Sequence, residues 1–465
     1  MTKRRPFDLL PALAAGLGFV LFSTATSANG AFPAVSQLVS DPADPDHLVL
    51  RSTFGLLVTR DRGQTWDWLC EAGLGYKDVQ PPMAVLAGGV ILLGVPNGIS
   101  RGDTSGCDFA LATGPDAAVF DLARVPAEAD GAVAVSLSGT TAQLWRTHDA
   151  GLSFIALGDP ISGFIPATVD VAPSDANVIY LSGLLGTQGS LLRSSDGGIS
   201  YATFAIPNTT TAHRPYIAAV DPNDADVVYV RLDGEPSELE VTRDGGKTFT
   251  APLTTEVPAL GLALSPDGQT VIASNSFDGT FRADAATLAF EKVACQGPSC
   301  LSFTDSGLFG CGDQRVDGFV VGESADRGRS FQRVVDLTCI RGPAACGSDT
   351  SVGQFCPEAW PPIQAQLGAT ECSPPDVRPY TGCFDGIAGD SGSEPAGGST
   401  ASGGTTGSPG QSAGTGAADT GGQRAGGGGG CQVAQGRASG SSAWLLAGAL
   451  GWFGLRRRRV QAWSP

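Results

Sequence analysis

An eight-residue motif, Ser/Thr-x-Asp-x-Gly-x-Ser/Thr-aromatic, constrains the fold of this chain more than any other feature. It occurs five times, at residues 59–66, 147–154, 194–201, 242–249 and 324–331. Two degenerate copies fill the gaps, at residues 100–109 and 282–290. From each Asp to the next, at positions 61, 103, 149, 196, 244, 284 and 326, the spacing is 40 to 48 residues. A regular period of this length indicates a propeller, a solenoid or another repeat array.

The residue types of the motif predict a tight turn that is followed by a strand. An Asp accepts hydrogen bonds from turn amides, and a Gly two positions later supplies a positive φ. The closing aromatic residue begins the next strand and packs on the sheet. We therefore expect structural rather than catalytic roles for Asp61, Gly63, Trp66, Asp149, Gly151, Phe154, Asp196, Gly198, Tyr201, Asp244, Gly246, Phe249, Asp326, Gly328 and Phe331.

A second repeated element lies upstream of three of these motifs. Residues 41–46, 173–177 and 221–226 are rich in Pro, Asp and Asn, and each precedes a β-rich run. Such clusters between two strands are turn signals, so we expect hairpins between the first and second strands of a four-stranded unit. Calcium binding is the alternative for acidic loops, but these lack the twelve-residue ligand pattern of an EF-hand. We expect no metal and no cofactor.

The five complete motifs resemble the Asp box, or BNR repeat, of sialidase-like β-propellers. This resemblance implies an all-β propeller with each box between the third and fourth strands of a blade. The seven evenly spaced Asp positions predict seven blades over residues 29–338, one more than sialidases have. Closing the ring protects strand edges. We expect the segment Ala34–Ser40 to close it by joining the blade that contains Phe331.

The N-terminal 28 residues have the organisation of a secretory signal peptide. Three basic residues, at positions 3–5, precede an apolar run over 9–22, and small residues end at Ala28. The pair Arg4-Arg5 leaves both the general and the twin-arginine export routes open. We therefore predict an exported protein that begins near residue 29.

The remaining chain is acidic. Residues 29–430 hold 21 Lys and Arg against 45 Asp and Glu, and the formal net charge of the whole chain is −17. Nucleic acids and anionic membrane surfaces are polyanions, so the composition disfavours both as partners of this region.

Eleven cysteines indicate disulfide bonds after export. Cys70 and Cys107 are candidates for a bridge between neighbouring blades. Residues 339–385 form a Cys-rich and Pro-rich segment with little strand pattern. Zinc is disfavoured because the paired short spacings of a zinc site do not occur. The candidates for five disulfides, of undetermined connectivity, are Cys70, Cys107, Cys295, Cys300, Cys311, Cys339, Cys346, Cys356, Cys372 and Cys383.

The C-terminal part divides into a linker and a tail. Residues 386–430 are mostly Gly, Ser, Thr and Ala, which is typical of a disordered linker. Residues 431–465 contain Cys431, a short apolar stretch over 443–455 that predicts a hydrophobic helix, and an arginine cluster at 456–459. This order of parts resembles the MYXO-CTERM sorting signal of myxobacterial exported proteins. The resemblance implies processing by a protease near Cys431, lipid attachment there as an open question, and display at the surface of a Gram-negative cell.

The alternative for this tail is an uncleaved membrane anchor that leaves the propeller facing the periplasm. The arginine cluster would then remain cytoplasmic by the positive-inside rule. Thirteen apolar residues are near the lower limit for spanning a bilayer.

For function, the sequence leaves two classes open. Propeller ligands generally bind on the face opposite the boxes, where we expect the loops 182–190, 203–216, 231–238 and 274–280. A glycoside hydrolase would need two facing carboxylates, and Asp233, Glu235 and Glu238 lie on one of these loops. The motif that opens the first blade of sialidases is absent, and Tyr is scarce.

Seven-bladed Asp-box propellers also resemble photosystem II assembly factors, which bind protein. We therefore favour a non-catalytic binding, adhesion or scaffold module whose ligand is a protein or a glycan. The hydrolase is the alternative.

Overall fold

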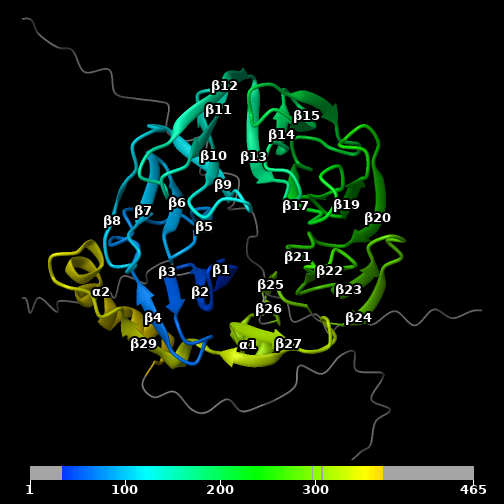
Figure 1. The fold of residues 1–465 in the computed structure, drawn as a ribbon. Helices are drawn as coiled ribbons and strands as arrows, with labels where there is room; N and C mark the ends of the chain where they lie inside the picture. Colours follow the sequence, from blue (N-terminus) through cyan, green and yellow to red (C-terminus); the bar gives the residue numbers. More distant parts are fainter. Residues whose placement is uncertain (1–33, 296, 305–306, 370–465) are drawn as a thin grey trace, which may run out of the picture. The chain divides into compact units, whose positions relative to one another are not determined.

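The computed structural model describes residues 34–295, 297–304 and 307–369. Seven sheets, each containing four consecutive antiparallel strands, form a ring, and the first sheet has a fifth strand from later in the chain (Figure 1). The chain is thus an all-β, seven-bladed propeller, as the spacing of the motifs predicted. We number the blades in chain order.

The strands of blades 1 to 4 have the following bounds. Blade 1 contains β1 (Val35–Asp41), β2 (Asp44–Ser52), β3 (Gly55–Thr59) and β4 (Trp66–Leu69). Blade 2 contains β5 (Met83–Val85), β6 (Ile91–Val95), β7 (Gly98–Gly102) and β8 (Phe109–Leu111). Blade 3 contains β9 (Ala118–Arg124), β10 (Ala132–Ser138), β11 (Thr141–Thr147) and β12 (Ile155–Ser162). Blade 4 contains β13 (Phe164–Val171), β14 (Ile179–Leu185), β15 (Gln188–Ser194) and β16 (Ala202–Ala205).

The other three blades are followed by a C-terminal segment. Blade 5 contains β17 (Pro215–Val220), β18 (Val228–Leu232), β19 (Ser237–Thr242) and β20 (Thr250–Thr255). Blade 6 contains β21 (Gly261–Leu264), β22 (Thr270–Asn275), β23 (Gly279–Asp284) and β24 (Glu291–Ala294). Blade 7 contains β25 (Cys300–Thr304), β26 (Gly307–Cys311), the short helix α1 (Gln314–Asp317), β27 (Val321–Ser324) and β28 (Gln332–Val335). The C-terminal segment contains the 3-10 turn η1 (Leu337–Cys339), β29 (Ile340–Pro343) and α2 (Ser351–Leu367).

The second strand of each blade is where the core is densest. Every residue of β6 and β22 is buried, because these strands lie between two neighbouring sheets. Outer strands such as β12 and β16 are largely exposed, with mostly polar or small residues. The apolar clusters accordingly join adjacent blades, so that each blade buries its faces against its neighbours.

Both families of predicted turns lie where the sequence places them. The five complete motifs connect the third and fourth strands, and the Pro/Asx-rich turns connect the first and second strands. Within a blade, the two turns are hydrogen-bonded to each other. Arg62 N donates to Asp46 O at 3.0 Å, and Gly245 N donates to Asp226 O at 2.9 Å. The two kinds of turn therefore share one face, which we call the box face.

The expected closure of the ring is wrong. β1 pairs with β2 in its own blade and does not join blade 7 as a strand. It packs beside β25 and β26, and the Arg62 side chain reaches Glu323 of blade 7 at 3.4 Å. The extra strand comes from the other end of the chain, since β29 adds to β4 in parallel, with Ile340 opposite Trp66. Its local sequence gives no sign of this distant partner.

The C-terminal segment packs on the outside of blade 1 (Figure 1). α2 begins after the N-cap Thr350, whose side chain accepts a hydrogen bond from Gly353 N at 3.2 Å. It ends at Gly368, which has a φ of 66°. Trp360 of α2 lies against Trp68 of β4, with ring centroids 5.4 Å apart. The segment for which the sequence showed little structure is thus a helix and a strand within the described range.

Disulfides tie this segment to the propeller, and they correct the expected bridge between Cys70 and Cys107. Cys70 pairs with Cys356, and Cys107 pairs with Cys346. The two cysteines thus attach neighbouring blades to the C-terminal segment rather than to each other.

The remaining cysteines complete this picture. Cys300 and Cys311 are paired within blade 7. Cys295 and Cys339 are also disulfide-bonded. Several disulfides indicate an exported protein.

Several predictions concern residues outside the described ranges. They include the signal peptide, Cys372, Cys383, the 386–430 linker and the tail with Cys431. The helices within the described ranges are all too short or too polar to span a bilayer.

Candidate functional site

The five complete motifs share one set of hydrogen bonds. In blade 4, Asp196 Oδ1 accepts from Ser200 N at 2.9 Å, and Asp196 Oδ2 accepts from Ser200 Oγ at 2.6 Å. Ser194 Oγ donates to Asp196 Oδ1 at 2.8 Å and accepts from Gly198 N at 2.8 Å. The corresponding bonds recur around Asp61, Asp149, Asp244 and Asp326.

These bonds favour the ionised form of the carboxylates. Donation by the Ser200 hydroxyl and backbone N–H lowers the pKa of Asp196 to about 2. Donation by the Thr248 backbone and hydroxyl does the same for Asp244. A group held ionised by its own turn is poorly suited to deliver a proton, which supports the structural role proposed for these residues.

The glycine of each motif lies against the preceding blade. Gly63, Gly151, Gly198, Gly246 and Gly328 all have positive φ, from 77° to 105°. A Cβ at position 198 would lie 2.6 Å from Leu144 Cδ2 of blade 3, which is too close. The closing aromatics Trp66, Phe154 and Phe331 are buried, and Tyr201 and Phe249 are partly buried. The turn thus contributes to packing between blades.

The loops of the opposite face hold the carboxylates of the hydrolase alternative. Asp233 forms an ion pair with Arg231, whose guanidinium lies over the Tyr216 ring, 4.7 Å from its centroid. Glu238 accepts a hydrogen bond from Asn208 Nδ2 at 2.9 Å. Glu235 precedes Pro236 in the turn between β18 and β19.

Sequence reasoning did not single out Glu240, a buried carboxyl close to this loop. Glu240 is 2% exposed, and Asn208 Nδ2 reaches its Oε1 at 3.4 Å. Burial, and then the charge of Glu238, raises the pKa of Glu240. Alternation along β19 places Glu240 on the face of Glu238, opposite Leu239 and Val241, so it did not indicate that Glu240 is buried. It could not have indicated that Asn208, from the link between blades, joins the two glutamates.

Two more acidic residues that the sequence did not single out lie on the innermost strands. Burial raises the pKa of Asp121 on β9 to about 7, and that of Asp170 on β13 to about 6. Asp121 Oδ2 accepts from Val169 N at 2.9 Å, which links blade 3 to blade 4. Shifted carboxyls are candidates for function, but the bond to Val169 gives Asp121 a structural task.

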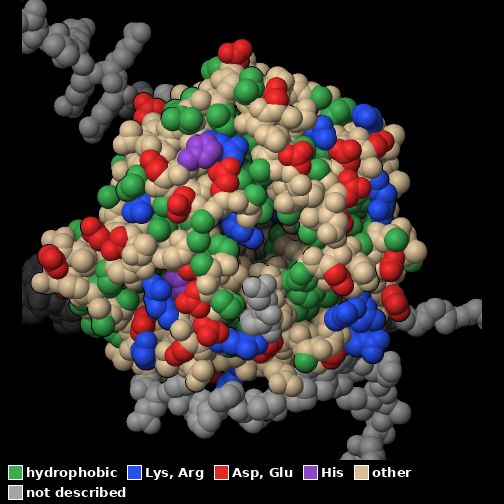
Figure 2. All heavy atoms as spheres, viewed as in Figure 1, with side chains coloured by type: hydrophobic (Ala, Val, Ile, Leu, Met, Phe, Trp, Pro, Cys, Tyr) green, Lys and Arg blue, Asp and Glu red, His purple; other side chains and the backbone are tan. Residues whose placement is uncertain are grey.

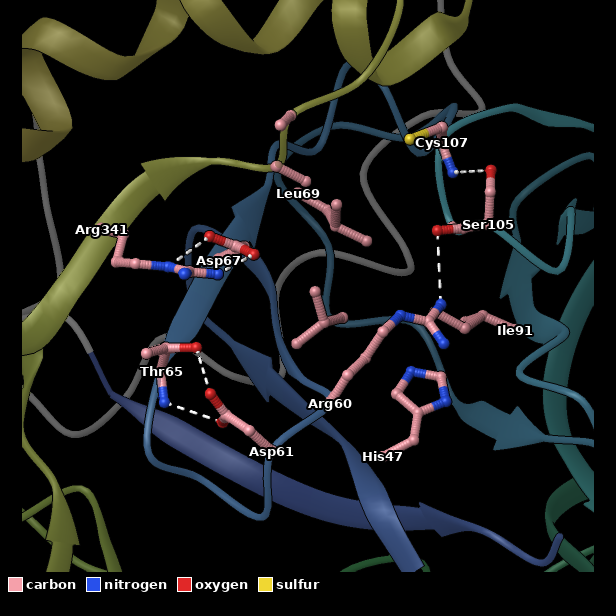
Figure 3. Close-up of a pocket in the computed structure, with 14 residues that line it drawn as sticks. His47, Arg60, Asp61, Thr65, Asp67, Leu69, Ile91, Ser105, Cys107 and Arg341 are labelled. Atoms are coloured by element: carbon pink, nitrogen blue, oxygen red, sulfur yellow. Dashed lines mark hydrogen bonds and ion pairs between the residues drawn. The ribbon is translucent and has the colours of Figure 1, made fainter. Parts of the chain in front are cut away.

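A cavity of about 440 Å³ lies at the box face beside blade 1 (Figure 3). Three parts of the chain line it: β2 to β4 with their turn, the degenerate turn of blade 2, and the C-terminal segment. The lining residues are His47, Val58, Arg60, Asp61, Thr65, Asp67, Leu69, Ile91, Ser105, Gly106, Cys107, Arg341, Ala344 and Ala345. Ligands were expected on the opposite face, so sequence reasoning missed this cavity.

Hydrogen bonds fix the charged groups of the cavity. Arg341 Nε and Nη2 donate to the two oxygens of Asp67 at 3.0 and 2.6 Å. Arg60 Nη2 donates to the carbonyls of Thr104 and Ser105 at 3.2 and 3.3 Å. The site is therefore preformed, with its polar groups held by the protein.

His47 is the buried polar residue of this cavity. It is 1% exposed, and its Nδ1 lies 3.5 Å from Asp41 Oδ2. Burial, and then the charge of Arg60, lowers the pKa of His47, so the imidazole is neutral at pH 7.

On the face seen in Figure 2, acidic and basic side chains are interspersed without a stripe of one charge. This face is hollowed near the centre of the ring. Among the described residues, no group of three or more His, Cys, Asp or Glu side chains is placed to hold a metal ion.

No protein-family model and no curated protein matches this sequence. Several solved structures resemble the fold. An ancestral GH74 enzyme is 16% identical over 65% of this chain and 45% of that chain, with a TM-score of 0.48. The GH74 xyloglucanase from Xanthomonas campestris is 17% identical over 68% of this chain and 62% of that enzyme, with a TM-score of 0.43. YCF48 from Cyanidioschyzon merolae is 17% identical over 60% of this chain and 92% of that protein, with a TM-score of 0.41.

The chain therefore spans less than two thirds of the length of either GH74 enzyme. At these identities and TM-scores, the likeness concerns the fold and carries no argument about activity.

Proposed function

We propose that this protein is an exported, surface-displayed binding module that acts in adhesion or as a scaffold, without catalysing a reaction. The observation that carries the proposal is the cavity at the box face. Its volume, about 440 Å³, lies within the range of ligand pockets, and disulfides hold its three parts together. A preformed site with fixed polar groups is suited to recognition.

The contacts of the loop carboxylates support binding over hydrolysis. A glycoside hydrolase needs one carboxyl that donates a proton and a second that stays ionised. Asp233 is paired with Arg231, and an oxygen of Glu238 accepts a hydrogen bond from Asn208. These carboxylates are therefore engaged within the protein.

Affinity electrophoresis and a reducing-end assay on the full-length secreted protein test this proposal. Xyloglucan, polygalacturonate and cell-surface glycans are the carbohydrate probes of both assays. A separate pull-down tests cell-surface proteins. We expect retardation or capture without any increase in reducing ends. Release of reducing ends that disappears in Glu238→Gln, but persists in the matched surface variant Glu291→Gln, would establish the hydrolase instead.

Surface display rests on the tail, which we propose is a processed sorting signal. The partners implied are a processing protease and, before processing, the membrane. Cys431 carries the only thiol of residues 384–465, and the glycine run before it lets an enzyme reach the backbone. The ten other cysteines precede the linker, so they can pair without Cys431.

Cys431→Ser should leave the propeller folded and stop maturation, so that the arginine cluster stays attached and the protein remains in the inner membrane. The mass of the C-terminal peptide and the membrane fraction of both proteins measure this. If wild type and variant both keep the arginines and fractionate alike, the tail is a plain anchor.

A further inference from the structure

The cavity beside blade 1 forms only when three distant parts of the chain meet. Arg60 comes from the turn that follows β3, Ser105 comes from blade 2, and Ala344 comes from the C-terminal segment. The Cys107–Cys346 disulfide joins the last two parts at the edge of the cavity. The charged groups of the cavity are therefore brought together only in the folded protein, where they form one site.

The lining holds two arginines and two aspartates, but only one arginine forms an ion pair with a lining aspartate. Asp61 is held by Thr59 and Thr65 within its own turn, and Asp67 is neutralised by the two bonds from Arg341. Arg60, by contrast, forms no ion pair with any residue in the described part of the chain. A guanidinium without an ion-pair partner can pair with the carboxylate of a ligand.

The neighbour of this cation is an acceptor. Figure 3 shows the His47 imidazole beside the Arg60 side chain. We assign the proton of His47 to Nδ1, because that atom faces the Asp41 carboxylate. Nε2 of a neutral imidazole then carries a lone pair, which accepts a hydrogen bond from a hydroxyl group. Cation and acceptor thus lie side by side.

The rest of the lining restricts the size and character of the ligand. Val58, Leu69 and Ile91 contribute apolar surface, and Thr65 and Ser105 contribute polar groups. A cavity of about 440 Å³ holds a molecule of the size of a single sugar ring and is small for a folded partner.

We propose that this cavity binds a small hydroxy acid, specifically a sugar acid of the hexuronate class. Its carboxylate pairs with Arg60, and a ring hydroxyl donates to Nε2 of His47. This inference rests on the proposed binding function and names its ligand class. It places the ligand on the box face, away from the loops around Glu238.

Isothermal titration calorimetry on the full-length secreted protein tests the ligand class, with D-galacturonate as the probe and D-galactose as its neutral match. The two sugars differ at C6, where one has a carboxylate and the other a hydroxymethyl group. We expect galacturonate to bind at least tenfold more tightly than galactose. Equal affinities, or no heat from either sugar, overturn the proposal.

Variants test the position of the site. Arg60→Gln should weaken galacturonate binding at least tenfold, whereas Arg62→Gln, which alters the neighbouring arginine paired with Glu323, should leave it unchanged. Circular dichroism confirms that both variants fold. If Arg60→Gln does not fold, Arg60→Lys keeps the positive charge, and we expect it to retain weakened binding. Undiminished binding in Arg60→Gln, or abolished binding in Arg62→Gln, overturns the site.

The imidazole signals provide a second measurement that needs no arginine variant. The chain has three histidines, so their ¹⁵N resonances are few, and His47→Gln identifies one of them. Galacturonate should shift the Nε2 resonance of His47 and leave those of His148 and His213 in place; no shift at His47 contradicts the proposal. If galacturonate fails while polysaccharide or cell-surface protein is still retained, the binding function stands and this ligand class alone is wrong.

Discussion

The turns at residues 194–201 of blade 4 and 102–109 of blade 2 occupy equivalent places, yet different contacts hold them. In blade 4, Asp196 and Ser194 close the turn on itself. In blade 2, Asp103 still accepts from Cys107 N at 3.0 Å, but Cys107 is bonded covalently to Cys346. The second turn keeps part of the motif and adds a partner from the far end of the chain.

The degenerate turn is a docking site for α2. Asp108 Oδ1 accepts from Ser351 N at 3.0 Å, and Phe109 N donates to Ser351 Oγ at 2.9 Å. Val352 N donates to the carbonyl of Cys107 at 3.0 Å. These contacts satisfy N–H groups of the first turn of the helix. A repeat can thus lose its local signature where a tertiary contact stabilises the turn instead.

Removing the disulfide between blade 1 and α2 should have the largest effect. The double variant Cys70→Ser/Cys356→Ser should lose roughly 2–5 kcal/mol of unfolding free energy, because its bridge spans 286 residues of sequence. Cys300→Ser/Cys311→Ser is the control, since that bridge spans 11 residues and restricts the unfolded chain less. Urea unfolding measures both. A greater loss in the control would show that loop length does not decide the stabilisation.

A glycine substitution compares the two turns directly. Gly198→Ala places a Cβ 2.6 Å from Leu144 at a φ of 94°, whereas Gly106→Ala, at a φ of 72°, meets no atom within 4 Å. We expect roughly 1 kcal/mol of destabilisation in Gly106→Ala from the backbone alone. Gly198→Ala should lose roughly 1–3 kcal/mol more from overpacking. The melting temperatures of both variants measure this difference. An equal decrease in the two variants would mean that Gly198 does not form a contact between blades.

The smallest effect should appear in the acid dependence of stability. The folded pKa of Asp196, about 2, lies below its ordinary value of 3.8, so its contribution is full above pH 3.8 and is lost as the pH falls toward 2. The unfolding free energy, measured by urea unfolding, should therefore fall less steeply between pH 4 and pH 2 in Asp196→Asn than in the wild type. The difference in slope should correspond to a fraction of one proton taken up on unfolding. The raised pKa values of Asp121 and Asp170 act equally in both proteins and cancel. An unchanged slope would contradict the hydrogen bonds assigned to this turn.

The sequence predicted those parts of the fold that local chemistry determines. Seven blades and both sets of turns follow from Asp, Gly and Pro at fixed spacing, because each turn is closed by residues within about six positions. The helix α2 was not predicted, because Pro357, Pro361 and Pro362 usually break helices. Here docking on blades 1 and 2, with two disulfides, overrides that preference.

The closure and the cavity could not be predicted for a related reason. The pairing of Ile340 with Trp66, and the meeting of Arg60 with Ser105 and Ala344, join positions distant in sequence. No local pattern marks them. The carboxylates on the opposite face were easier to see because they are close in sequence, but the sequence did not show that Asp233 pairs with Arg231 and Glu238 with Asn208.

The Cys70–Cys356 bridge has a mechanical consequence. A force applied between residue 34 and residue 369 would pass through blade 1 to Cys70, across the bridge to Cys356, and out through α2. Blades 2 to 7 lie inside the covalent loop and would carry no load. If the tail anchors the protein as proposed, the described part of the chain resists pulling without extending most of its length. Single-molecule extension should release the contour length of those six blades under reducing conditions, and should withhold it while the bridge is intact.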